Sequence, residues 1–148
     1  MYVESWYRKH PSSARVAAQD CRRLILSVDD QLSVLFARYK VLTSAGYAVL
    51  SATDGVQALQ IFAGNPVDLV LLDFSLQAMD GGLVAEAMKE CELHVPIVIV
   101  SGAEVPEKCL AIVNGYIRKG DGPELLLQSI QQLLSPTSQP GLDRRTVA

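Results

Sequence analysis

Several residue types that would mark a common protein class are scarce in this 148-residue chain. It has three cysteines and two histidines, and only 6% of its residues are aromatic. The cysteines, Cys21, Cys91 and Cys109, are odd in number and lack CxxC spacing, which argues against a disulfide framework or a zinc site. We therefore interpret them as reduced thiols that pack in the interior.

Long apolar runs and a strong charge of one sign are also missing. No apolar stretch approaches the roughly 20 residues that a membrane helix needs, and residues 1–20 lack the apolar segment of a signal peptide. A net charge of −3 gives no electrostatic basis for binding nucleic acid. We expect a cytoplasmic protein that neither inserts into a membrane nor binds nucleic acid directly.

The chain does contain enough apolar residues for one sizeable core, since they make up 49% of the sequence. We expect this domain over residues 21–135. Residues 1–20 are polar and basic without an apolar period, and are interpreted as a poorly ordered extension. Residues 136–148 begin with a segment rich in proline and serine, and are interpreted as a flexible tail.

Strand-like and helix-like segments alternate five times within the domain. Short apolar runs predict strands at 22–28, 47–52, 67–72, 96–100 and 115–118. Nearly continuous apolar strands that alternate with helices are typical of a parallel sheet covered on both faces. Right-handed crossovers leave few topologies, and we expect the flavodoxin-like α/β sandwich, a five-stranded parallel sheet in the order 2-1-3-4-5.

The segments between the strands repeat apolar residues at helical spacing. The first helix is expected to bury one face, formed by Leu32, Leu35, Phe36, Tyr39 and Leu42. Gly46 should stop this helix, and Thr53-Asp54 should cap the next one. Further stripes are Val56, Leu59, Phe62 and Ala63, then Val84, Ala87, Met88 and Cys91, and finally Leu126, Ile130, Leu133 and Leu134.

Polar side chains follow four of the predicted strands. Asp29 and Asp30 follow the first strand, Asp73 the third, Ser101 the fourth and Lys119 the fifth. Because ligands of parallel α/β sheets bind outside the carboxyl ends of the strands, we expect these side chains to form a site at one edge of the sheet. In the expected strand order, the first and third strands are neighbours, which places Asp29 and Asp30 beside Asp73.

The chemistry of this cluster indicates phosphoryl transfer. Three neighbouring carboxylates repel one another, and oxygen ligands without histidine or cysteine favour a hard cation such as Mg²⁺, with Mn²⁺ as an alternative. A carboxylate beside such an ion can attack phosphorus and form an acyl phosphate. The metal and Lys119 would neutralise the phosphoryl oxygens, and Ser101 could donate a hydrogen bond to one of them.

In order and spacing, these residues resemble the receiver domain of two-component response regulators, the CheY-like superfamily. The resemblance rests on Asp29-Asp30, Asp73, Met79-Asp80-Gly81, Ser101-Gly102 and Tyr116-Ile117-Arg118-Lys119. It implies that Asp73 is the phosphoacceptor, and that Asp29, Asp30, Asp73 and the backbone carbonyl of Ser75 are the metal ligands. It also implies that Ser101 and Lys119 bind the phosphoryl group and that Tyr116 is a switch residue.

The resemblance further implies a stand-alone or excised receiver that does not turn over an external substrate. It would accept its phosphoryl group from a sensor histidine kinase or a phosphotransfer protein, and would signal to a downstream output protein. Segments 103–114, 115–118 and the last helix would build its signalling face and could form a homodimer.

Three other functions are alternatives. A receiver-like interaction module that works without phosphorylation stays open. An enzyme of the haloacid-dehalogenase type is disfavoured because Ser75 stands where such enzymes commonly need a second acid. A flavin or nucleotide binder is disfavoured because no glycine-rich loop follows the first strand.

The sequence departs from the family pattern at three places. Gln77 stands where a proline is common, and Gly120 replaces the proline that often follows the site lysine in a cis peptide. The stretch from Ser101 to Lys119 is several residues short, with the loss around 103–114. We therefore expect the surface beyond the site to differ from that of typical receivers.

Overall fold

The computed structural model describes residues 22–135, so the predicted extension 1–20, Cys21 and the predicted tail 136–148 lie outside the described residues. Five strands alternate with five helices in this region. The strands are β1 (Leu24–Val28), β2 (Ala48–Ala52), β3 (Leu69–Asp73), β4 (Ile97–Ser101) and β5 (Gly115–Arg118). The helices are α3 (Leu32–Ser44), α4 (Gly55–Gly64), α5 (Gly81–Cys91), α6 (Glu107–Leu110) and α7 (Pro123–Leu134).

The strands form one parallel sheet in the order β2-β1-β3-β4-β5, which confirms the predicted topology. Val28 pairs with Leu72, and Asp73 pairs with Val100, so β1, β3 and β4 end at the same edge. The first four strands start one or two residues later than predicted, and β3 and β4 extend to Asp73 and Ser101. Both polar residues therefore belong to the strands and are held by the pairing of the sheet.

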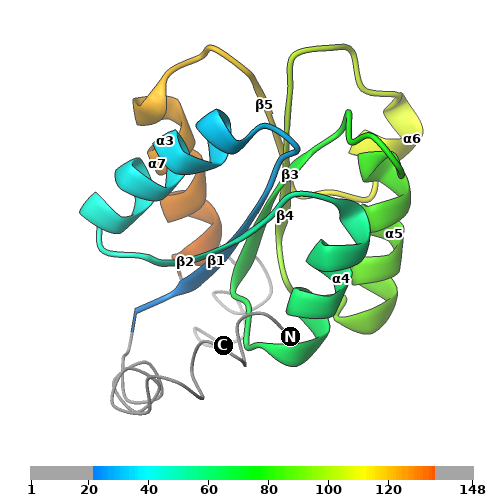
Figure 1. Ribbon diagram of the computed structural model, residues 1–148, viewed down its shortest axis with the longest axis horizontal. Coiled ribbons are helices and arrows are strands. Elements are labelled where there is room, and N and C mark those ends of the chain that lie inside the picture. Colours follow the sequence, from blue (N-terminus) through cyan, green and yellow to red (C-terminus); the bar gives the residue numbers. More distant parts are fainter. Residues whose placement is uncertain (1–21, 136–148) are drawn as a thin grey trace, which may run out of the picture.

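The sheet separates two layers of helices (Figure 1). Helices α3 and α7 cover one face, and α4, α5 and α6 cover the other. A hydrophobic core lies on each face of the sheet, and the central strand β3 contributes to both because its side chains alternate between the faces. Leu69 and Leu71 pack on the side of α3 and α7, whereas Val70 and Leu72 pack on the side of α4 and α5. Because helices cover both faces of the sheet, a ligand can reach the strands only at their ends.

The predicted inner face of α3 is wrong in part. Leu35 and Leu42 are buried as expected, but Leu32, Phe36 and Tyr39 are 71%, 65% and 48% exposed. The helix is rotated so that Arg38, rather than Phe36 or Tyr39, lies between the two leucines on the buried face. Arg38 binds Ser27 of β1 and Asp29, which directly follows β1, so its buried position on α3 has polar partners at the sheet.

Three other predicted core positions are also solvent-exposed. Val56, Ala63 and Cys91 lie on outer faces of α4 and α5, so Cys91 does not pack in the interior as expected. Cys109 is buried, and both of these cysteines are free thiols. All three lie in the first or last turn of their helix, whereas the other residues of these two stripes are buried or half-buried.

The predicted ends of the helices agree better with the structure. Gly46, which follows the C-cap residue Ala45 of α3, has a φ of +99°, which residues with side chains rarely adopt. Asp54 caps α4 by accepting the N–H of Gln57 at 2.8 Å. Helix α6 has only four residues, in keeping with the shortened segment 103–114. Within residues 22–135 no helix has the length and apolar character needed to cross a membrane.

Candidate functional site

Three carboxylates meet at the carboxyl edge of the sheet. Asp73 is the last residue of β3, and Asp29 and Asp30 directly follow β1, which pairs with β3. One oxygen from each carboxylate lies within 4.8 Å of the others. Asp29 and Asp73 are buried, at 0% and 2% exposure, and Asp30 is half-buried. The strand ends thus bring together the three acids that the sequence placed in one cluster.

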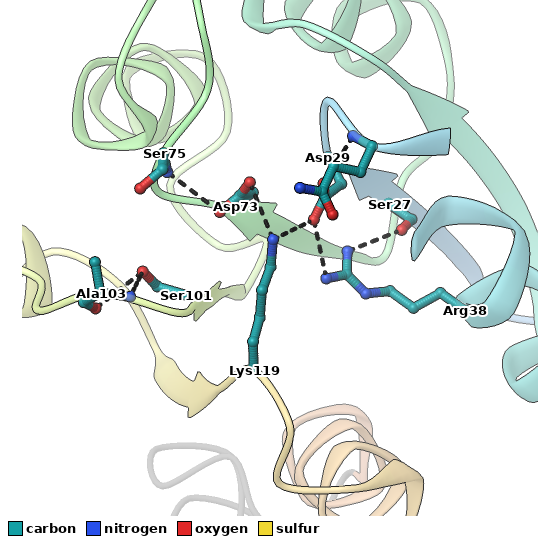
Figure 2. Close-up of polar contacts among 9 residues, drawn as sticks. Ser27, Asp29, Arg38, Asp73, Ser75, Ser101, Ala103 and Lys119 are labelled. Carbon is teal, nitrogen blue, oxygen red and sulfur yellow. Dashed lines mark hydrogen bonds and ion pairs between the residues drawn. The ribbon is translucent and has the colours of Figure 1, made fainter. Parts of the chain in front are cut away.

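Lys119 provides a positive charge at the centre of this cluster. It follows β5, and its Nζ lies 2.9 Å from Asp29 Oδ2 and 3.3 Å from Asp73 Oδ2 (Figure 2). Burial works to lower the pKa of Lys119, but the hydrogen bonds and negative charges of Asp29 and Asp73 outweigh it and raise that pKa. The lysine is therefore a cation at neutral pH and relieves part of the repulsion between the acids.

Backbone N–H groups hold the other oxygens of the two buried acids. Asp29 Oδ1 accepts the N–H of Gln31 at 3.0 Å, and Asp73 Oδ1 accepts the N–H of Ser75 at 3.2 Å. Each bond spans two residues, a local arrangement that aspartate commonly forms where the chain leaves a strand. By contrast, the Asp30 side chain makes no hydrogen bond or ion pair with residues 22–135. Asp30 is therefore the acid most available to a ligand.

Sequence reasoning missed a second cation, Arg38. Its side chain is buried on α3, and its Nη2 lies 3.4 Å from Asp29 Oδ2. Burial lowers the pKa of Arg38, while the charges of Asp29 and Asp73 oppose this shift; a guanidinium remains charged at neutral pH. The available signal was the spacing of Leu35, Arg38 and Leu42, which puts a charge in the middle of an apolar helix face.

The structure does not bring Ser101 and Tyr116 into contact with the acids. Ser101 ends β4 and is buried, but its hydroxyl donates to the carbonyl of Ala103 at 3.0 Å and accepts the N–H of Ala103 at 3.1 Å (Figure 2). Tyr116 lies in β5 and is 41% exposed. In this conformation the acids and Lys119 are together, whereas the two predicted switch side chains are turned elsewhere.

Two glycines shape the backbone around the site. A Cβ at Gly81 would lie 2.6 Å from the carbonyl oxygen of Asp73, so only glycine lets the start of α5 approach the end of β3. Gly120, which replaces the family's proline, has a φ of +97°, a value that the ring of proline forbids. Residues 22–135 contain no cis peptide. The loop after Lys119 thus differs from the Lys-Pro arrangement, as the sequence suggested.

The donor set suits a hard divalent cation. The three carboxylates offer only oxygen ligands within 4.8 Å of one another, and neither histidine nor cysteine belongs to the group. Such ligands favour Mg²⁺ or Mn²⁺ over zinc or copper. The residues present are therefore compatible with the metal that the sequence predicted.

The chain belongs to the family of response regulator receiver domains, whose model matches residues 25–131. It is 32% identical over 125 residues to the probable transcriptional regulator ycf27 of Cyanophora paradoxa, covering 82% of this chain and 52% of that protein. It is 33% identical over 118 residues to the response regulator MprA of Mycobacterium sp. (strain KMS), covering 77% of this chain and 51% of the relative.

Solved structures share the fold. The chemotaxis protein CheY4 of Vibrio cholerae is 28% identical, with a TM-score of 0.72 over 77% of this chain and 100% of that chain. A CheY-like receiver domain protein from Methanospirillum hungatei is 26% identical, with a TM-score of 0.73 over 76% of this chain and 94% of the other. The chain spans about half the length of the curated relatives named above.

Proposed function

We propose that this chain is a receiver that accepts a phosphoryl group on Asp73 in a reaction that depends on a divalent cation. One observation carries the proposal: the Asp73 carboxylate lies within 4.8 Å of two other carboxylates and contacts the ammonium of Lys119. This combination supplies a nucleophile, ligands for a cation and a fixed positive charge in one place. The membership of the chain in the receiver family supports the same function.

The metal ligands proposed are the carboxylates of Asp29, Asp30 and Asp73 and the backbone carbonyl of Ser75. Mg²⁺ is the cation expected, and Mn²⁺ could take its place because it accepts the same oxygen ligands. When bound, the cation would neutralise charge on the phosphoryl oxygens. Asp30 would contribute most directly, since its carboxylate has no partner within residues 22–135.

In the reaction, one oxygen of Asp73 attacks phosphorus and forms a new P–O bond. The bond between phosphorus and the donor breaks, and the donor keeps its electron pair. Lys119 would donate hydrogen bonds to the phosphoryl oxygens from its present position beside Asp73. The Ser101 hydroxyl would give up its hydrogen bond to Ala103 and donate to a phosphoryl oxygen instead. The space that this hydroxyl leaves would allow Tyr116 to turn inward.

Such a receiver would exchange phosphoryl groups and signals with other proteins. We propose residues 21–135 as the receiver unit, stand-alone or excised from a longer protein, in the cytoplasm. A sensor histidine kinase or a phosphotransfer protein would supply the phosphoryl group, and an output protein would read the change. The face formed by α6, β5 and α7 could also pair two copies. No turnover of an external substrate is expected.

An interaction module that functions without phosphorylation is the second candidate. The observation that favours it is the hydroxyl of Ser101, which is already bonded to Ala103 both as donor and as acceptor. Helix α6, with its four residues, offers less surface than a longer helix for transmitting a change at the site. The two candidates differ in whether the site reacts at all.

Intact-mass measurement separates them. The chain is incubated with acetyl phosphate in Mg²⁺, in EDTA, and as the Asp73→Asn variant. We expect a gain of one phosphoryl group in Mg²⁺ alone. Equal labelling of Asp73→Asn would contradict the assignment, and the absence of labelling in Mg²⁺ would favour the interaction module.

A further inference from the structure

A buried arginine lies directly behind the acidic site. Arg38 is 6% exposed and occupies the inner face of α3 between Leu35 and Leu42. Such a position usually carries an apolar side chain, because moving a guanidinium out of water is costly unless partners compensate for the lost hydration. The partners of Arg38 therefore indicate why a cation is tolerated here.

These partners are two polar side chains at the carboxyl end of β1: Ser27 lies in the strand and Asp29 follows it. Arg38 Nη2 lies 3.4 Å from Asp29 Oδ2, and Nη1 lies 3.4 Å from Ser27 Oγ (Figure 2). Ser27 and Asp29 are two residues apart, so they point to the same face of the sheet, where α3 packs. Both are fully buried. Ser27 in an apolar strand and Arg38 on an apolar helix face are thus hydrogen-bonding partners.

Arg38 and Lys119 bind the same oxygen, Asp29 Oδ2, at 3.4 and 2.9 Å. The three carboxylates of the site are thus balanced by two cations, which leaves a net charge of −1, and without Arg38 it would be −2. Lys119 is 28% exposed on a flexible stem and can turn away from Asp29. Arg38, 7% exposed in its side chain, is enclosed and stays in place.

We infer that Arg38 is a positioning residue that holds the Asp29 carboxylate and weakens the affinity of the acidic site for divalent cations. A fixed cation next to the ligand oxygens repels an incoming metal ion, and burial strengthens this repulsion because little water lies between the charges. The same cation stabilises the three acids against one another when no metal is bound. This inference rests on the proposed metal site and adds a determinant of its affinity.

Four variants of the full chain test the inference. Arg38→Met and Arg38→Gln remove the charge, and Arg38→Lys keeps it. Lys89→Met is the control for the loss of a cation elsewhere: Lys89 is partly buried, and its Nζ bonds to Val95 O and Asn114 Oδ1 near the amino ends of β4 and β5. The glutamine variant can still bond to Ser27, so it serves if the methionine variant does not fold.

The affinity for Mg²⁺ is measured by titration calorimetry at constant ionic strength. We expect both neutral variants to bind Mg²⁺ about tenfold more tightly than the native chain, since one neighbouring charge is removed. The Mg²⁺ affinities of Arg38→Lys and Lys89→Met should stay within about twofold of the native value, because neither substitution changes the charge near the site. Equal or weaker binding in the neutral variants would overturn the inference, as would an equal gain in Arg38→Lys.

The rise in melting temperature on addition of Mg²⁺ gives a second readout, which the loss of a purely structural arginine would leave unchanged. We expect Mg²⁺ to raise the melting temperature of Arg38→Gln more than that of the native chain, compared with EDTA. Equal gains would contradict the inference. If the native chain binds Mg²⁺ and the neutral variants bind it equally, only the role of Arg38 fails. If no variant binds Mg²⁺, the proposed metal site fails as well.

Discussion

Lys119 and Asp29 form the closest ion pair of the site, with 2.9 Å between Nζ and Oδ2, whereas the same nitrogen lies 3.3 Å from Asp73 Oδ2. The ammonium of Lys119 thus lies closer to Asp29 than to Asp73, the proposed phosphoacceptor. Asp29 is also bound by Arg38, while Asp30 has no partner within residues 22–135. The two adjacent acids therefore differ in their availability to a metal ion.

This difference predicts unequal effects of two isosteric substitutions. Asp30→Asn should weaken Mg²⁺ binding by about tenfold or more, because it removes the carboxylate that is free to coordinate. Asp29→Asn should weaken it less, because the lost charge is one that Arg38 and Lys119 already neutralise. Calorimetric titration of both variants with MgCl₂ measures the two affinities. Equal losses would show that the existing ion pairs do not decide which acid coordinates.

The role of Lys119 can be separated from that of the acids. Lys119→Met should slow labelling by acetyl phosphate by at least about tenfold, because the phosphoryl oxygens lose a cationic partner. Its Mg²⁺ affinity should not fall, since a positive charge is removed beside the ligands. Labelling time courses and calorimetry provide the two values, with Lys119→Arg as the charge-preserving control. A variant that loses metal affinity and labelling together would mean that Lys119 organises the acids instead.

Stability away from the site should depend on the cap of α4. Asp54 accepts the N–H of Gln57 at 2.8 Å, so Asp54→Ala should lower the free energy of unfolding by about 1 kcal/mol. Glu90→Ala on the exposed side of α5 serves as a control for removing an acid. Urea unfolding of both variants measures the difference. A loss no greater than that of Glu90→Ala would refute the contribution of the cap.

Signal transmission should begin by breaking the contact between Ser101 and Ala103. Beryllofluoride with Mg²⁺ should shift the amide resonances of Ser101, Tyr116 and Lys119, because the Ser101 hydroxyl would leave the backbone of Ala103 for the bound phosphoryl analogue. We expect further shifts in residues 103–114, which start at that backbone contact. Two-dimensional NMR of the labelled chain records them. Shifts limited to residues at the ligand would mean binding without switching.

The topology and the acidic cluster could be predicted because both follow from local patterns. Five apolar runs determine the strands, and the parallel order brings Asp29, Asp30 and Asp73 to one edge. The inner face of α3 could not be predicted in the same way. Helical spacing alone allows either Phe36 or Arg38 to face the sheet, and the choice depends on Ser27 and Asp29 of another element.

The conformation of Ser101 was equally inaccessible to sequence reasoning. Its position at the end of β4 follows from the apolar run that precedes it. The direction of its hydroxyl depends on the loop after β4, where the backbone of Ala103 offers both an acceptor and a donor. The sequence thus predicts that Ser101 lies near the site, whereas the hydrogen-bond partner of its hydroxyl depends on the conformation of the loop.

Chemical mapping of the phosphorylated residue tests the central claim most directly. The chain is treated with acetyl phosphate and Mg²⁺ and then with borohydride, which reduces an aspartyl phosphate to homoserine. Peptide mass mapping then locates the homoserine. The account predicts homoserine at position 73 alone, dependent on Mg²⁺. Homoserine at position 29 or 30 instead, or no homoserine after successful treatment of a control receiver, would contradict the account.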